Sequence, residues 1–446
     1  MMRSDNPEFQ RQIWLTWSLT RALVMPALLG LAAAAVALAA RDAQEAAANL
    51  ARAAVIGFVV VVWLYGSREA GASVVDEIRD RTWDQQRMGA LPPWPMTWGK
   101  LLGSTSLAWW GGAICAGVYA AAAVQAGLAQ WPLTLLTLVA GGVALQALAS
   151  LLNLHLALFD ERLAARGGLW WLLVLALWGF GPISLLGELD GRGWWGFTLS
   201  GAVLAAGSAC LIAACLVTAL WRRTAEALAV RQLPWAWPLL AVVLAVWSAG
   251  FVLGTSVEGA LHTVLAGVVT FAGVFTLLVL VSEPNDRTRW AAIGARALRG
   301  EWRRALERLP LWPVSLTLAL AAALLLTVVS SRPSAGDVPK LTEVIRADSL
   351  MALTLVLMLV RDCALATALA WRTRVRRPVG AFLLCLLVLY VLLPWLAGAL
   401  ELKPVLHALL PPSLLVVREA AGSMLALAAV HAVLGLLLAA WSWRRP

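Results

Sequence analysis

Long apolar blocks separated by short polar segments dominate this sequence. The blocks are about 18 to 27 residues long, the length that a helix needs to cross roughly 30 Å of hydrocarbon. With 61% hydrophobic and 13% charged residues, the 446-residue chain has too little polar surface to cover a water-soluble globule. We therefore expect an all-α polytopic membrane protein.

The apolar blocks predict about twelve transmembrane helices. They cover residues 22–40, 53–66, 101–127, 131–157, 169–187, 196–220, 237–254, 262–282, 313–330, 349–370, 379–399 and 422–442. The second of these is short, and we expect it to extend a few residues at either end. With a cytoplasmic N-terminus, the cytoplasmic segments contain 26 of the 35 Lys and Arg residues, the outer loops contain 8, and Arg361 lies inside a span. This bias follows the positive-inside rule and predicts that both termini are cytoplasmic. The net charge of +10 is thereby explained by topology, and we expect no nucleic-acid partner.

The cysteines and the basic residues indicate where the protein resides. All five Cys lie in predicted spans without CxxC spacing, which indicates neither a disulfide nor a metal site. Arg outnumbers Lys by 32 to 3, as in proteins from GC-rich bacterial genomes. No cleavable signal peptide is expected, because the polar start MMRSDNPEFQRQIWLTW is too long and too mixed for an n-region. We predict a multi-pass protein of a bacterial inner membrane.

Two pairs of similar segments predict an internal repeat. LPPWPM at 91–96 resembles LPLWPV at 309–314, and RQIWLTW at 11–17 resembles RQLPWAW at 231–237. The two pairs have nearly the same separation, which is close to half the length of the chain. Each half contains six spans, so both halves insert in the same orientation and the repeat is parallel. We therefore expect a first six-span half at 1–222 and a second at 223–446; the alternative is that Trp and Pro are simply common at membrane borders.

Each half also has an amphipathic cytoplasmic segment. In the segment 7–21, Phe9, Ile13 and Trp17 recur every four residues. In the segment 283–312, Trp290 and Trp302 belong to an apolar stripe, and the segment carries seven Arg. Such segments are expected in the headgroup layer, with their guanidinium groups toward anionic lipid.

The sequence contains no recognisable catalytic motif. The only Gly-Lys pair, Gly99-Lys100, lacks the GxxxxGK[ST] pattern that binds phosphate, so we expect no ATPase activity of this chain's own. HExxH, GxSxG and Cys/His clusters are also absent. We expect no catalytic residue, no bound metal and no cofactor on this chain.

A few polar residues fall inside predicted spans. Arg361 and Asp362 lie near the middle of the tenth span, where charges are costly and are a functional hypothesis by default. An ion pair that fixes helix packing, or a span that ends earlier, are the alternatives. Asn153 and His155 near the inner end of the fourth span are expected to form hydrogen bonds between helices.

The segment between the second and third predicted spans is unusual for a simple loop. It begins with Ser67-Arg68-Glu69-Ala70-Gly71 and ends with PPWPMTWGK at 92–100. A short helix is expected at about 75–88, ended by Gly89 and Pro92-Pro93 because Pro cannot continue a helix. Trp94 and Trp98 are expected at the membrane interface.

This segment, together with 7–21, resembles ABC transporter permeases of the six-span type-2 exporter class. Arg68, Glu69 and Gly71 match the family's ERExGT-like start, whereas Ser67 and Ala72 depart from it, and PPWPMTWGK is similar to its end. The chain looks like two fused permease halves, and the corresponding segment of the second half, 283–312, lacks these features.

The resemblance implies that 67–100 is a coupling segment for a separate cytoplasmic ABC ATPase. We expect two ATPase copies, which would carry ATP and Mg²⁺. The residues expected to contact the ATPase are Arg68, Glu69, Gly71, Asp84, Gln85, Gln86 and Arg87. The function implied is ATP-driven export of a hydrophobic or amphipathic molecule. The alternatives are an ion-gradient-driven secondary transporter with two six-span halves, and a scaffold protein without transport.

Overall fold

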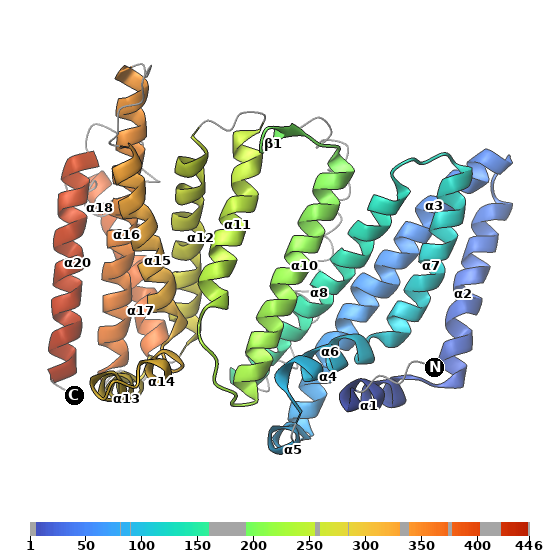
Figure 1. Cartoon of the computed structure of the whole chain (residues 1–446), viewed down its shortest axis with the longest axis horizontal. Helices are drawn as coiled ribbons and strands as arrows, with labels where there is room; N and C mark the ends of the chain where they lie inside the picture. The colour runs from blue at the N-terminus through green and yellow to red at the C-terminus, as the bar shows by residue number, and fades with distance from the viewer. Residues whose placement is uncertain are drawn as a thin grey trace. The chain divides into compact units, whose positions relative to one another are not determined.

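The computed structural model describes residues 6–80, 82–89, 91–159, 193–254, 259–283, 285–330, 339–372, 377–401 and 421–444. These residues are almost entirely helical, and eleven of their helices are long and apolar enough to cross a membrane (Figure 1). The chain therefore has the architecture of a multi-pass membrane protein. It packs as two compact units, Met1–Arg192 with Thr198–Gln232, and Gly193–Phe197 with Leu233–Pro446.

The first unit begins with a short helix and continues with helices of membrane length. Its elements are α1 (Pro7–Thr16), α2 (Leu19–Leu38), α3 (Ala43–Phe58), the π-helix η1 (Val59–Tyr65), α4 (Gly66–Arg79), α5 (Thr82–Met88), α6 (Pro93–Ser104), α7 (Ser106–Gln125), α8 (Trp131–Phe159) and α10 (Gly201–Ala227). Elements α3, η1 and α4 follow one another without a break from Ala43 to Arg79. At 1.5 Å per residue this helical stretch is about 55 Å long, which exceeds the roughly 30 Å hydrocarbon core.

Side-chain caps set the helix boundaries at the start of this unit. The side chains of Asn6, Ser18 and Asp42 each accept a hydrogen bond from backbone N–H groups in the first turn of α1, α2 and α3. The extended backbone of Trp17, followed by the Ser18 cap, separates α1 from α2. The expected amphipathic helix at 7–21 is therefore a short helix followed by the first turn of a span.

The segment 67–100 has a different helix pattern from the one predicted. The second span continues as α4 to Arg79, and the short helix begins at Thr82, not at 75, and ends at Met88, before Gly89. Helix α6 starts at Pro93 and ends at Ser104. The third span, predicted from residue 101, begins with α7 at Ser106.

Helices α8 and α10 lie parallel and pack through small residues. Ala140 and Ala144 contact Ala213 near the start of the pairing, and Leu154 shares a cluster with Ala227 near both C-terminal ends. The C-terminal end of α8 and the start of α10 consequently lie at opposite ends of the unit. The predicted fifth span, 169–187, belongs to the connection between them and lies outside the described residues.

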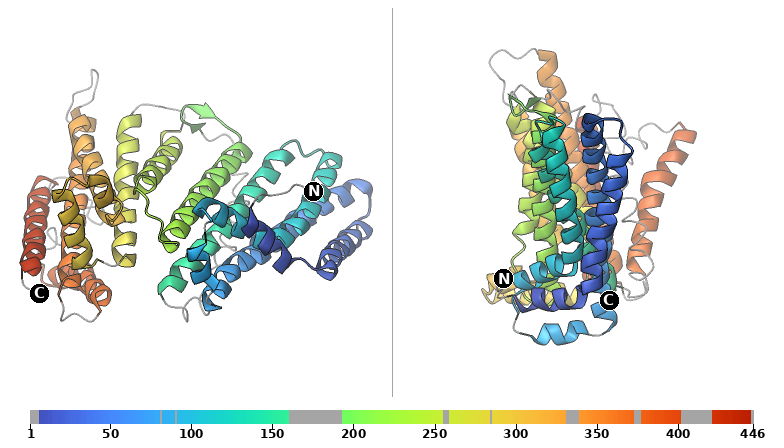
Figure 2. Two further views of the ribbon diagram at one scale, coloured as in Figure 1. Left: turned by 60° about the horizontal axis from the view of Figure 1, so that its bottom comes forward. Right: turned by 90° about the vertical axis from the view of Figure 1, so that its right-hand side faces the viewer.

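The second unit contains a further set of helices and is preceded by a two-stranded hairpin. The elements are β1 (Gly193–Trp194) paired with β2 (Phe197–Thr198), α11 (Ala236–Leu253), α12 (Ala260–Ser282), α13 (Arg287–Leu298), α14 (Trp302–Leu306), α15 (Leu311–Ser330), α16 (Pro339–Ala370), α17 (Pro378–Leu387), the π-helix η2 (Val388–Leu392), α18 (Leu393–Ala399) and α20 (Ala421–Arg444). Figure 2 shows α13 and α14 running across the end of this unit, at an angle to its long helices.

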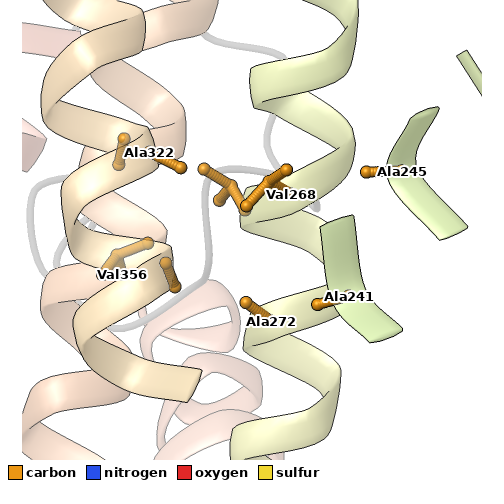
Figure 3. Packing of buried hydrophobic residues seen from close by; sticks show 9 residues of the cluster. Ala241, Ala245, Val268, Ala272, Ala322 and Val356 are labelled. Carbon is orange, nitrogen blue, oxygen red and sulfur yellow. The ribbon is translucent and has the colours of Figure 1, made fainter. Parts of the chain in front are cut away.

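The core of the second unit is built from alanine and valine. Ala241 and Ala245 of α11 face Val268 and Ala272 of α12, and Ala322 and Val356 extend the cluster onto α15 and α16 (Figure 3). Small side chains allow the helix backbones to approach closely, which matters because lipid provides no hydrophobic force between helices. Helix α16 packs in parallel with α20, as shown by the contacts of Gly435 with Arg361 and of Trp443 with Trp371.

Helix boundaries recur along the chain at a constant separation, close to half the chain length. This separation relates three pairs of boundaries: the starts of α2 and α11 at Leu19 and Ala236, the starts of α3 and α12 at Ala43 and Ala260, and the ends of α10 and α20 at Ala227 and Arg444. The starts of α6 and α15, in the LPPWPM and LPLWPV segments, follow it to within one position. At this separation, the last residue of α12, Ser282, corresponds to Tyr65. The helix of the first half continues beyond Tyr65 as α4, whereas α12 ends.

Candidate functional site

Helix α5 lies beyond the end of the long helix Ala43–Arg79 and is held there by a buried tryptophan. Trp83 is only 5% exposed and packs with Val74 of α4 and Met96 of α6. The same cluster includes Leu154 of α8 and Leu228 at the end of α10. The short helix is therefore fixed to the ends of four longer helices.

The outer side of α5 is open. Gln85 is exposed, Met88 is 82% exposed and Gln86 is half-buried, whereas the side chains of Asp84 and Arg87 lie outside the described residues. On α4, Arg68 is exposed and forms a 3.0 Å ion pair with the partly exposed Glu69. We use the name α4–α5 surface for these positions taken together, of which Arg68 and Glu69 lie in the first turn of α4 and the others on α5: Arg68, Glu69, Gln85, Gln86 and Met88.

Gly71 has a structural role that differs from the predicted partner contact. It is buried, and a Cβ atom at this position would lie 2.5 Å from Nδ2 of Asn153 on α8. Asn153 is also buried and donates to the carbonyl of Ala149 in its own helix. A side chain at position 71 would therefore displace the Asn153 amide where α4 crosses α8, and the predicted sites Gly71 and Asn153 meet at this crossing. His155, nearer the end of α8, is half-buried.

A buried charge network, which the sequence reading missed, joins α1, α4 and α6. Glu8 and Glu77 both contact Arg11 and Lys100, and the Nε2 of Gln12 donates to both carboxylates at 3.0 and 2.9 Å. Glu8, Gln12, Glu77 and Lys100 are each less than a tenth exposed. Two carboxylates are balanced by two cations, so the buried network carries no net charge. We call these five residues the Glu77 network.

Electrostatics and close backbone packing hold α1 in place. Burial alone would raise the pKa of Glu8, but hydrogen bonds from Arg11 and the charge of Lys100 outweigh it and lower the pKa below its usual 4.5. The hydrogen bond to Glu8 correspondingly raises the pKa of Arg11. On α6, a Cβ atom at Gly99 would lie 2.9 Å from the backbone nitrogen of Phe9, and one at Gly103 would lie 2.6 Å from Cβ of Gln12.

Consequently, α1 turns its polar face inward. The sequence pattern predicted an apolar stripe of Phe9, Ile13 and Trp17, and these residues are half-buried or only modestly exposed. The most exposed apolar side chain of α1 is Trp14, at 86%. A helix whose polar face is neutralised by the protein can present an apolar face to lipid headgroups.

A second polar cluster lies inside the spans of the other unit. Arg361 donates from Nε to Oδ1 of Asp362 at 2.9 Å and from a guanidinium nitrogen to the hydroxyl of Tyr390 at 2.6 Å. The Tyr390 hydroxyl donates to Oδ2 of Asp362 at 2.5 Å, and the Arg361 guanidinium lies 5.1 Å from the ring centre. Both residues lie within α16, in its stretch of membrane length Ser349–Ala370, and are less than a tenth exposed.

Tyr390 was not predicted as the partner of Arg361 and Asp362. It lies in η2, a short π-helical segment, and such segments are often found at functional sites. His431 of α20 has an Nδ1 atom that is buried and has no hydrogen-bond partner among the described residues. Because Gly435, one helical turn after His431, contacts Arg361, this side of α16 gathers a cation with a carboxylate, a phenol and an imidazole, and the last three groups can transfer or store a proton.

The predicted interface tryptophans pack at the ends of the helices. Trp94 lies edge-on to Trp98 at 5.4 Å and to Trp221 at 5.6 Å between ring centres. Trp290 packs against Trp312 at 5.8 Å and donates to Asn285 at 2.7 Å. Trp302 is 64% exposed.

The described residues contain no group of three or more His, Cys, Asp or Glu side chains that could hold a metal ion. Comparison with known proteins gives no further identification, since no family model, no curated protein and no solved structure matches the chain.

Proposed function

We propose that this chain is the membrane subunit of an ATP-driven ABC exporter whose ATP is hydrolysed by a separate cytoplasmic subunit. The observation that carries the proposal is α5, a short helix held by the buried Trp83 beyond a helical stretch of about 55 Å. Movement of α5 would be transmitted directly to a span, because α4 continues through η1 into α3 without a loop. This is the arrangement that a transporter without its own ATPase needs.

The proposed partner contacts the α4–α5 surface. Arg68, Glu69 and Gln85 offer polar contacts, and Met88 offers an apolar side chain that an ATPase cleft could cover. Asp84 and Arg87 remain proposed contacts from the sequence, whereas Gly71 acts through the crossing of α4 and α8. ATP and Mg²⁺ would be bound by the partner, in an inner-membrane complex that exports a hydrophobic or amphipathic molecule.

The proposal includes two six-span halves that arose by duplication and insert in parallel, with both termini cytoplasmic. Support comes from the helix boundaries that recur at a constant separation. Further support comes from the parallel pairs α8–α10 and α16–α20, which occupy corresponding places in the two halves.

A second candidate function is an ion-gradient-driven transporter. The observation that favours it is the buried cluster of Arg361, Asp362 and Tyr390, because intramembrane ionisable groups often form proton relays. In that case Asp362→Asn would abolish gradient-driven transport while changes on the α4–α5 surface would have no effect.

Purification with the native partner separates the two functions. The tagged chain is isolated from its host in mild detergent, the co-purified proteins are identified by mass spectrometry, and ATP turnover is measured. The variant Gln85→Ala/Met88→Ala is expected to lose a bound ATPase. Its matched control, Leu128→Ala/Gln130→Ala, changes an exposed apolar and an exposed polar residue at the turn between α7 and α8, and should retain the ATPase.

If the chain purifies without an ATPase, or if the α5 variant retains the ATPase and its turnover, the exporter proposal is wrong. Loss of gradient-driven transport in Asp362→Asn would then favour the second function.

A further inference from the structure

The second half differs from the first at the position that corresponds to α4. In the first half the helix continues past Tyr65 through all of α4, whereas α12 ends at Ser282, the corresponding position. Glu283 has an extended backbone, and the next residue in the sequence is Pro284, which disfavours helical geometry in the residue before it. The second half therefore has no extension of a span to carry a helix like α5.

Helices α13 and α14 occupy this place, and the start of α13 is bound to the ends of the spans. Asn285 donates to Thr367 of α16 at 2.9 Å, and the Arg287 guanidinium lies 5.0 Å from the ring of Trp443 in α20. Arg289 donates to the carbonyl of Arg308 at 2.9 Å, just before α15. These contacts keep α13 close to the helix ends, as Figure 1 shows for α13 beside the lower ends of α16 and α20.

The remainder of this element is exposed and combines apolar with cationic side chains. Leu298 is 91% exposed, Trp302 64% and Leu306 45%. The side chains of Arg303 and Arg304 are 83% and 65% exposed, and each pairs with a glutamate of its own segment at more than 3 Å, a contact that contributes little in water. We call the residues from Leu298 to Leu306 the α13–α14 surface.

The charge of this element suits an anionic surface, in contrast to the α4–α5 region. Segment 283–312 contains seven Arg and four acidic residues, whereas segment 67–100 contains five basic and five acidic residues. Leucine and tryptophan favour the boundary between headgroups and acyl chains, and arginine favours anionic headgroups. If this Leu, Trp and Arg surface lies in the headgroup layer, a soluble ATPase could dock on it only by displacing the lipid that covers it.

We propose that the α13–α14 surface binds the anionic surface of the membrane and that the chain has a single ATPase-docking element, α5. The part of this proposal that concerns the ATPase rests on the proposed function; the lipid part does not. It predicts one ATPase copy per chain, in place of the two copies that a duplicated exporter would bind.

Leu298 and Met88 provide a matched pair for the test, because they are 91% and 82% exposed, respectively, on corresponding segments of the two halves. Leu298→Cys and Met88→Cys are introduced separately into the full chain. The wild-type protein is labelled in parallel, and its labelling gives the background from the five native cysteines. Each is reconstituted in nanodiscs, which leave both membrane faces accessible, and labelled with a water-soluble maleimide. If the side chain at position 298 is buried in lipid, exposing it to the reagent costs about as much free energy as exposing a leucine-sized group to water. Labelling at position 298 should therefore be at least about tenfold slower than at position 88.

Two further comparisons separate lipid from protein cover. Adding phosphatidylglycerol to phosphatidylcholine nanodiscs should slow labelling at 298 further, by up to about fivefold for each arginine near the surface. Arg299→Gln/Arg303→Gln/Arg304→Gln should remove this lipid dependence. Adding the ATPase should protect position 88 only, and mass spectrometry of the intact complex should give one ATPase per chain.

Equal labelling at 298 and 88 without ATPase would overturn the proposal, as would protection of both positions on ATPase addition. If no ATPase protects position 88 while 298 stays protected by lipid, the lipid inference stands and the proposed function fails.

Discussion

The Glu77 network permits a test of how α1 is held, through the variant Lys100→Met. The Lys100 side chain is 8% exposed and contacts two carboxylates, Glu8 at 3.1 Å and Glu77. Its replacement by methionine keeps the length of the side chain but leaves two buried carboxylates with Arg11 as their only cation in the network. Removing one partner from a buried ion pair costs about 3–5 kcal/mol of unfolding free energy, because the remaining charge is left uncompensated.

A double-mutant cycle combines Lys100→Met with the single variant Glu77→Gln and the double variant Glu77→Gln/Lys100→Met, which removes one charge of each sign. Glu8 and Arg11 then remain as a balanced pair at 2.8 Å, so part of the lost stability should return. We expect a coupling energy of about 1–3 kcal/mol between the two positions. Equilibrium unfolding in mixed micelles, followed by tryptophan fluorescence, measures each variant.

Arg68→Met is the matched control for this cycle. It also replaces a cation that pairs with a glutamate, but the Arg68 side chain is 61% exposed, and an exposed pair contributes about 0–1 kcal/mol. The reasoning would be refuted if Lys100→Met cost no more than Arg68→Met, or if the effects of the two substitutions in the cycle simply added.

Three further outcomes are expected. Because the pKa of Glu8 is lowered in the folded protein, its contribution to stability is present above about pH 4.5 and should be lost as the pH falls below it, which proteolysis of α1 at stepped pH would detect. A Glu8→Gln variant should lack this part of the pH dependence, and a wild-type pH dependence that equals that of Glu8→Gln would contradict the reasoning. Gly103→Ala should destabilise by about 1–3 kcal/mol, because its Cβ atom would meet Gln12 at 2.6 Å, whereas Gly117→Ala, with nothing within 4 Å, should be neutral or stabilising in the same unfolding assay. Tyr390→Phe removes two hydrogen bonds to charged groups and should lower the unfolding free energy by about 1.5–3 kcal/mol; an unchanged midpoint would show that the hydroxyl does not bridge the ion pair.

The sequence predicted the parts of the fold that depend on local composition. The apolar blocks correspond to eleven membrane-length helices in the described residues, because the thickness of a bilayer sets helix length directly. Boundaries that depend on tertiary contacts were less accurate: the polar residues 66–79 continue the second span as α4, since α8 covers Gly71 and α6 neutralises Glu77.

The candidate site was predictable only in part for a similar reason. The pattern of α1 defines a polar face containing Glu8 and Gln12, but a helical wheel does not indicate whether water or protein covers that face. The signal available in the sequence was the pair Gly99 and Gly103, spaced like Glu8 and Gln12 by one helical turn, which indicates a helix that accepts a close neighbour. Tyr390 gave no signal, because its meeting with Arg361 depends on the packing of η2 against α16.

The divergence of the two halves at Ser282 follows from a small difference in sequence. Both halves keep their helix starts and ends at a constant separation, which maintains the packing of the spans. After position 65 the first half has Gly66 and a run of helix-compatible residues, whereas after position 282 the second half has Glu283-Pro284. Proline in the interior of a helix costs about 3 kcal/mol, enough to end α12 at Ser282. Beyond that point the chain forms α13 and α14, whose exposed leucine, tryptophan and arginine side chains are those that the proposed position at the membrane surface favours. Helices that begin and end at a constant separation along the chain can therefore be followed by a projecting helix in one case and, as we propose, by a surface-bound helix pair in the other.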